Sequence, residues 1–167
     1  MTEALSTPDQ IPDLPTVERY NEFISKLEFS DIRLVKLEAE ALIPNPEPTE
    51  VGVQFRMSTA LETFKELPNN FMVYAKGNAA FISHEDEDSK AGEISVVLCL
   101  YYKSSVPISE SLFEVFSNLN VPTHAWPYFR EYIHQTVTRF GWPTFLLPPY
   151  KTGVDDEEDE DTAKSSE

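Results

Sequence analysis

Glycine, cysteine and histidine are scarce in this chain. Its 167 residues include five glycines, one cysteine and three histidines. So few glycines leave little material for a phosphate-binding loop or a dinucleotide fingerprint, and neither motif is present. The single cysteine, Cys99, excludes an internal disulfide framework. The three histidines show no ligand spacing, so we expect neither a metal nor a cofactor.

The residues needed for catalysis are equally sparse. Cys99 lies in an apolar strand pattern, where cysteine usually acts as a small hydrophobic residue and not as a nucleophile. The acidic run at residues 85–88 lacks the glycine and the later acid of a calcium loop. The sequence therefore predicts that the protein is not an enzyme.

Positive charge is in short supply. Thirteen basic residues face 29 acidic ones, and the formal net charge is −16. Such a charge disfavours nucleic acid and anionic membranes as partners, although the run DDEEDED at residues 155–161 carries much of it. No apolar run approaches the roughly 20 residues of a spanning helix, and the start has no secretory signal pattern. We therefore expect a cytoplasmic protein that does not insert into membranes.

The hydrophobic pattern predicts one domain, at residues 16–150, between a flexible leader (residues 1–15) and an acidic disordered tail (residues 151–167). A short amphipathic helix is expected from Thr16, which can cap it. Residues 29–42 then alternate like a strand, but the apolar positions change parity near Val35, which indicates a bulge. A helix continuing through KLEAEAL is the poorer alternative.

Three further strands are predicted downstream. Residues 51–58 alternate cleanly, a turn is expected at LPNN, and residues 71–83 form a strand with a bend at Gly77 and Asn78. The strand at residues 93–103 is apolar at both parities, so we expect it to be buried on both faces. Short turns cannot make parallel crossovers, and the fold class is therefore α+β, a four-stranded antiparallel meander with a long C-terminal helix on one face.

That helix is predicted to begin between Thr123 and Pro127 and to end at Gly141, after a short capped turn near Ser111. One side of it repeats apolar residues at helical spacing and should be buried. These residues are Phe129, Ile133, Val137 and Phe140.

The run PYFREYIHQTVTRFGWPTFLLPPY at residues 127–150 resembles the SecB family of bacterial protein-export chaperones. The matching positions are Pro127, Tyr128, Arg130, Glu131, Ile133, Arg139, Pro143, Leu147 and Pro149. The resemblance implies an ATP-independent holdase for unfolded or secretory polypeptides, assembled as a dimer of dimers. Some SecB-like proteins serve a dedicated client such as an antitoxin. A non-enzymatic adaptor of the same fold, recognising one specific folded partner, is the alternative.

The resemblance also implies roles for individual residues. The expected client-binding surface contains Phe55, Met57, Phe81, Tyr101, Tyr102, Trp142 and Phe145. Tyr128 and Tyr132 would lie toward a partner subunit. Family members dock the motor SecA through their first and fourth strands, where Asp31 and Leu98 match, but Val35 and Leu100 replace two of the family's acidic residues.

Overall fold

The computed structural model describes residues 13–44, 46, 51–83 and 89–151. Its elements follow in the order α1 (Val17–Ser25), β1 (Leu27–Ala41), β2 (Val51–Phe64), β3 (Leu67–Ser83), β4 (Lys90–Ser104) and α2 (Glu110–Arg139). The expected leader and acidic tail lie outside the described residues, except for residues 13–15 and Lys151, and so does the acidic turn at residues 85–88.

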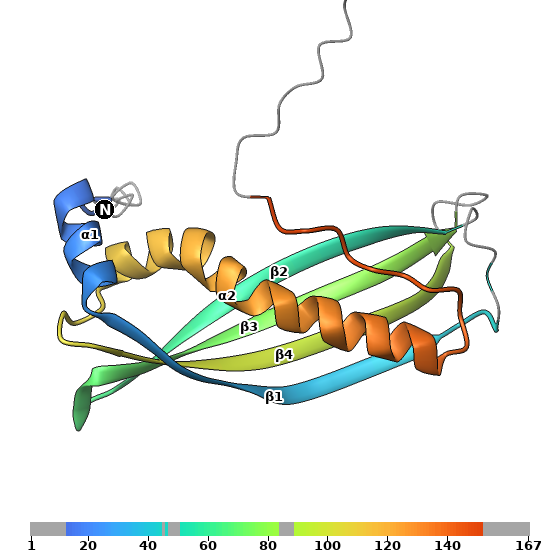
Figure 1. Ribbon diagram of the computed structural model, residues 1–167, viewed down its shortest axis with the longest axis horizontal. Coiled ribbons are helices and arrows are strands. Elements are labelled where there is room, and N and C mark those ends of the chain that lie inside the picture. Colours follow the sequence, from blue (N-terminus) through green and yellow to red (C-terminus); the bar gives the residue numbers. More distant parts are fainter. Residues whose placement is uncertain (1–12, 45, 47–50, 84–88, 152–167) are drawn as a thin grey trace, which may run out of the picture.

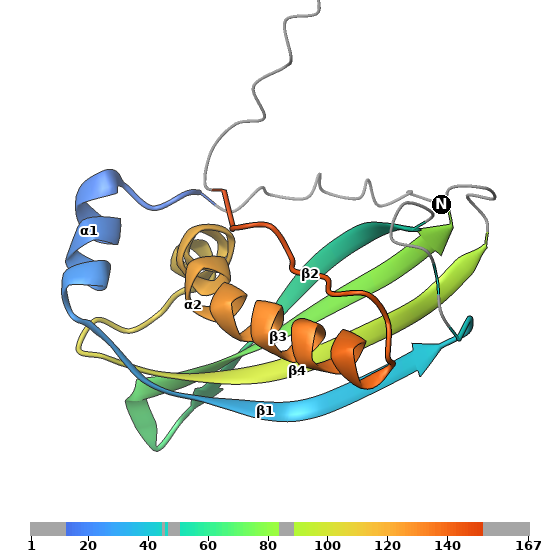
Figure 2. The ribbon, with the colours of Figure 1, turned by 45° about the vertical axis from the view of Figure 1, so that its right-hand side comes forward.

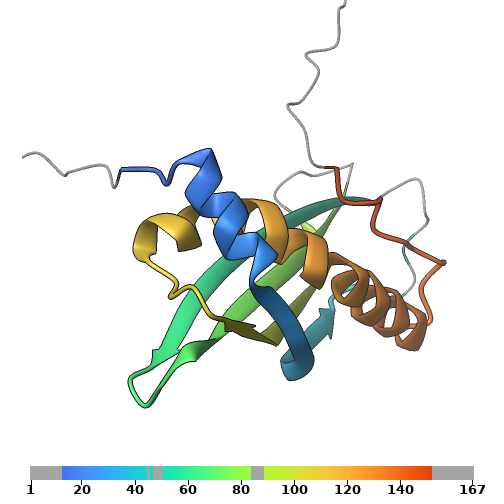
Figure 3. The ribbon, with the colours of Figure 1, turned by 60° about the vertical axis from the view of Figure 1, so that its left-hand side comes forward.

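All four strands form one antiparallel sheet in the order β1-β4-β3-β2. Strands β2, β3 and β4 make the predicted meander, whereas β1 crosses over to pair with β4, so β1 and β2 are the two edges. Helix α2 lies across one face of this twisted sheet, and α1 stands at one end, beside the first half of α2 (Figures 1 and 3). The predicted α+β class is confirmed.

Strand β1 contains the predicted bulge. Leu34 pairs with Leu98 and Lys36 with Val97, so Val35 is an extra residue without a partner on β4. The bulge keeps Leu37 on the same face of the sheet as Leu34, which explains the change of parity in the sequence. The alternative of a helix through this stretch is wrong.

Two expectations about β2 and β3 are wrong in detail. The hairpin turn is at Lys65 and Glu66, and LPNN belongs to β3, where it forms an irregularity in the pairing. Gly77 causes no bend, because its pairing is regular on both sides. A Cβ at Gly77 would lie 2.8 Å from ring atoms of Phe55 and Phe129, so the glycine is there to let the aromatic rings of β2 and α2 approach the sheet.

Helix α2 begins much earlier than predicted. Ser109 caps it by accepting a hydrogen bond from the Leu112 N–H, and Pro127, which was expected at the helix start, lies inside the helix together with Pro122. Its first half bends away from the second half (Figure 2), which is the usual effect of interior proline. The C-terminal stop at Gly141, with φ of 74°, is as predicted. No helix in the described part of the chain is long and apolar enough to cross a membrane.

The core lies between α2 and the sheet. Phe129, Ile133 and Val137 of the predicted helical face are buried there, while Phe140 is half-buried at the rim. At the other end, Phe23 of α1 packs on Phe71 and Phe116 with ring centroids 6.2 and 5.6 Å apart. The opposite face of the sheet has no covering element in the described residues. The prediction that β4 is buried on both faces is therefore only half correct, because residues such as Val97 and Tyr101 keep part of their surface exposed.

Candidate functional site

The chain after Gly141 turns back and runs beside α2, on the side of β2 (Figures 1 and 2). We call residues 142–150 the strap. Trp142 fixes its first end, because its indole N–H donates to the Ile43 carbonyl at 3.1 Å and its ring packs against Phe81 and Phe140 at centroid distances of 5.3 and 5.1 Å. Further along, the side chain of Leu147 is buried in the core.

Three side chains of α2 donate hydrogen bonds to main-chain carbonyls of the strap. His134 Nδ1 lies 3.0 Å from the Phe145 oxygen, Arg130 Nε lies 2.8 Å from the Leu147 oxygen, and Trp126 Nε1 lies 2.9 Å from the Pro148 oxygen. The imidazole Nδ1 must carry its hydrogen, since a carbonyl oxygen only accepts. Residues four apart lie on one side of a helix, so the three donors form a row. We call this row the donor ladder.

The last residue of the strap uses a carbonyl that proline has set free. Pro122 has no N–H with which to bond the carbonyl of Asn118, four residues earlier. The hydroxyl of Tyr150 lies 3.4 Å from this oxygen, and the Tyr150 ring packs on Trp126 with centroids 5.3 Å apart. The bend in α2 thus supplies an acceptor for the end of the strap.

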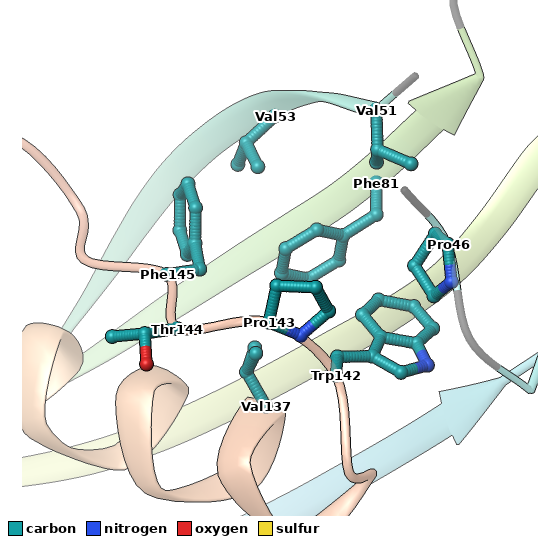
Figure 4. A pocket seen from close by; sticks show the side chains of 9 residues that line it. All are labelled: Pro46, Val51, Val53, Phe81, Val137, Trp142, Pro143, Thr144 and Phe145. Carbon is teal, nitrogen blue, oxygen red and sulfur yellow. The ribbon is translucent and has the colours of Figure 1, made fainter. Parts of the chain in front are cut away.

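Two hollows lie in line along β2, each with the strap as part of its wall. The first has a volume of about 90 Å³ and lies between Val51 and Val53 of β2 and the strap residues Trp142 and Phe145 (Figure 4). Phe81 forms its floor and makes edge-to-face contacts with both strap rings, at 5.3 and 5.4 Å. The surface of this hollow is mostly apolar.

The second hollow, of about 390 Å³, lies where the strap ends. Phe55, Met57 and Thr59 of β2 face Trp126 of α2 and Tyr150 of the strap across it. Phe55 packs edge-to-face on Trp126 with centroids 4.9 Å apart. We refer to the two hollows together as the β2 groove. Its outer side is β2, which is an edge strand of the sheet that the described residues form.

The seven residues expected to bind clients occupy three places. Phe55 and Met57 line the second hollow, and Phe81, Trp142 and Phe145 line the first. The two remaining residues are elsewhere. Tyr102 is buried in the core, whereas Tyr101 lies on the uncovered face, with the Arg33 guanidinium 4.9 Å from its ring centroid. Both contribute to a third hollow, at the β2–β3 hairpin end of the sheet. The expected single surface is thus reduced to five residues in the β2 groove.

The residues expected to contact a motor or a partner subunit lie in different parts of the structure. Leu98 is fully buried beneath α2, so its side chain is not exposed to a docking partner. Asp31 is exposed on the uncovered face and accepts hydrogen bonds from Arg33 and from the Ile32 N–H, which lower the pKa of its carboxyl. Tyr128 and Tyr132 are half-buried on α2, and the helical repeat puts them on the side away from the donor ladder.

Cys99 keeps 2% of its surface exposed although it lies on the uncovered face. Its sulfur is 3.6 Å from the sulfur of Met72, and burial raises the pKa of its thiol. A raised thiol pKa lowers the thiolate fraction, which agrees with the expectation of an inert cysteine. Across the described ranges, no three His, Cys, Asp or Glu side chains are grouped to hold a metal ion.

Most of the net charge belongs to residues outside the described ranges. Of the 29 acidic residues, 16 lie there, together with one of the 13 basic residues. The described part therefore contains 13 acidic and 12 basic residues and is close to neutral. The apolar groove is thus carried by a body without a strong electrostatic field of its own.

The sequence did not predict the donor ladder. Arg130 and His134 lie on the polar side of the helical pattern, yet both are half-buried against the strap. The available signal was the spacing of Trp126, Arg130 and His134, which puts three N–H donors on one side of a helix. That spacing has meaning only if an extended segment passes beside it, and the return path of the strap is a property of the whole fold.

No protein-family model matches the chain, and no curated protein matches it. Among solved structures, it is similar to the SecB-like chaperone Rv1957 of Mycobacterium tuberculosis, determined with a ChAD peptide from the HigA1 antitoxin. The TM-score is 0.71 at 14% identity, over 81% of this chain and 99% of that chain. This likeness shows a SecB-like fold, as the sequence predicted. A Streptococcus agalactiae protein of unknown function aligns more weakly, at TM-score 0.41 and 11% identity, over 73% of this chain and 96% of that chain.

Proposed function

We propose that this protein is an ATP-independent chaperone that holds extended, apolar segments of non-native polypeptides in the β2 groove. The observation that carries the proposal is the pair of hollows in line along β2, the first mostly apolar and the second with both aromatic and polar walls, beside a row of donors that already binds an extended main chain. Apolar walls bind side chains of many shapes, while donors aimed at carbonyls recognise any extended backbone.

The fold supports the same proposal. The SecB-like chaperone with which this chain shares its fold was solved with a peptide from an antitoxin. We therefore include a dedicated client of this kind, as well as secretory polypeptides, among the segments that the groove would hold. The proposal contains no catalytic step. It also contains no docking of SecA, because Leu98 is buried and Asp31 is already paired with Arg33.

We also propose that a second copy of the chain covers the outer edge of β1. This edge has no neighbour in the sheet order, and β1 is 15 residues long. Several large apolar side chains along β1 and directly after it are exposed: Phe29, Leu34, Val35, Leu37, Leu42 and Ile43. A long open edge that carries exposed apolar side chains can pair with another strand. Tyr128 and Tyr132 would extend the interface from α2.

The groove is tested by a pair of neighbouring substitutions. Val53 lines the first hollow, whereas Gln54 points to the uncovered face and is exposed. Without ATP, we expect the parent chain to suppress aggregation of two unrelated unfolded clients, such as denatured citrate synthase and reduced insulin. Val53→Asp should lose most of this suppression, because a charge disfavours binding of apolar segments. Gln54→Asp should behave like the parent.

Two results would count against the proposal. Failure of the parent at several-fold molar excess over both clients would reject the chaperone. Unchanged suppression by folded Val53→Asp would reject the β2 groove as its site. If the parent captured one folded partner at fixed stoichiometry and unfolded chains did not compete, the adaptor alternative would replace the holdase.

A further inference from the structure

The strap is held firmly at one end and weakly at the other. At the Trp142 end, the indole bonds the Ile43 carbonyl and lies over Gly92, where a Cβ would come within 2.6 Å of the ring. At the Tyr150 end, the one direct hydrogen bond of the side chain is long, at 3.4 Å. The residues on either side of Leu147 add to this contrast, because Leu146, Pro148 and Pro149 are all exposed.

The strap has the chemistry that the proposed function expects of a client. It is an extended apolar segment, and its Phe145, Leu147 and Pro148 carbonyls occupy all three donors of the ladder. The hydrogen bonds of these donors go to main-chain oxygens and not to strap side chains, so the bonds are not specific to this sequence. Any other extended segment that used the ladder would have to replace the strap there.

We propose that the strap is a displaceable occupant of the donor ladder, which swings out from its Tyr150 end about the Trp142 anchor when a client segment binds. This inference rests on the proposed function and adds its regulation. Release of the Tyr150 end would free Trp126 and Arg130 and open the second hollow, where Phe55 and Met57 lie. The closed strap lowers the apparent affinity for clients, because only the open fraction of molecules can bind.

The test uses the full chain and a labelled peptide with the strap's own sequence, WPTFLLPPY. Tyr150→Ala removes both the ring contact with Trp126 and the bond to Asn118. We expect this variant to bind the peptide about five- to tenfold more tightly than the parent, because more molecules are open. Tyr150→Phe, which loses only the hydroxyl, should give a smaller gain. The matched control is Leu146→Ala, a strap substitution at an exposed side chain, which should bind like the parent.

A peptide affinity of Tyr150→Ala that is no higher than that of the parent would overturn the inference. If the strap is a fixed wall, loosening it removes part of the site, and Tyr150→Ala binds the peptide equally or more weakly. Hydrogen exchange provides a second measurement that needs no ligand. The indole N–H of Trp126, which donates to the Pro148 carbonyl, should exchange by local opening well before the indole N–H of Trp142, which donates to the Ile43 carbonyl, and equal protection of the two would reject a displaceable strap.

The peptide experiment also separates this inference from the proposed function. Tighter binding by Tyr150→Ala, combined with no suppression of client aggregation, would support strap release while rejecting the chaperone. Suppression of client aggregation without tighter peptide binding by Tyr150→Ala would support the chaperone while rejecting strap release.

Discussion

Aromatic rings at the interface between α2 and the sheet determine the identity of their small neighbours. Gly77 is needed because Phe55 and Phe129 meet above it, and Gly92 because the Trp142 indole lies on it. A glycine in a strand interior usually suggests a bulge, which is why the sequence predicted a bend at Gly77. The actual reason is a close approach by rings that are distant in sequence, and no local pattern contains that information.

His124 is the residue for which burial has a measurable consequence. Its ring stacks on Phe29 with centroids 4.9 Å apart, and its Nδ1 lies 2.9 Å from the Tyr102 hydroxyl. Burial disfavours the charged imidazole and lowers the pKa of His124. Because this pKa is lower in the folded state than in the unfolded state, the neutral His124 makes its full contribution to the free energy of unfolding above the ordinary histidine pKa of about 6.5. The effect is lost as the pH falls through the folded pKa.

We therefore expect the melting temperature of the parent to fall as the pH is lowered from 7.5 to 5. In His124→Phe, which keeps an aromatic ring against Phe29, this part of the fall should disappear. Thermal unfolding followed by circular dichroism across that range measures both. Parallel curves for the two proteins would contradict the assignment to His124.

At the level of the element, β1 shows what a period-two pattern can establish. The change of parity near Val35 located the bulge correctly, because one face of β1 must keep its apolar residues toward α2. The start of α2 could not be obtained in the same way. Pro122 and Pro127 resemble first-turn residues locally, but packing of Leu112 and Phe116 in the core keeps the helix continuous through both prolines.

The bulge makes a clear prediction about deletions. Removing Val35 leaves Leu34 opposite Leu98 and Leu37 opposite Val96, so every side chain keeps its face. We expect a loss of about 1 kcal/mol or less in the free energy of unfolding. Removing Leu37 instead moves Glu38 opposite Val96 and exchanges the faces of the residues after it, so we expect a larger loss, of about 1–3 kcal/mol.

Urea unfolding of the two deletion variants measures this difference. Equal destabilisation by both deletions would mean that Val35 is not the extra residue.

For the whole molecule, the two edge strands have different surroundings. The β2 edge borders the groove and the strap, whereas the β1 edge has exposed apolar side chains and no element beside it in the described residues. Sequence patterns predicted self-association, and five of the seven residues expected to bind clients line the β2 groove, although their role stays a prediction. They could not identify the edges, because the order of strands depends on the crossover of β1 to β4.

The β1 edge is tested by Leu34→Lys. We expect the parent to form oligomers whose mass depends on concentration, and the variant to shift toward the monomer, because a lysine on an edge strand opposes pairing with another strand. Native mass measurement over a range of protein concentrations reports the outcome. Leu146→Lys, which adds the same charge at an exposed site on the strap, is the control. Equal masses for Leu34→Lys and the control would place the interface elsewhere.

The shielding of Cys99 has a practical consequence for following the strap. Its thiol is nearly inaccessible and has a raised pKa, so it should react slowly with thiol-specific dyes while the protein is folded. A cysteine introduced at an exposed strap position such as Leu146 would then be labelled first, without replacing the natural cysteine. The chain thus accepts a single probe on the strap, which makes its movement accessible to fluorescence in solution.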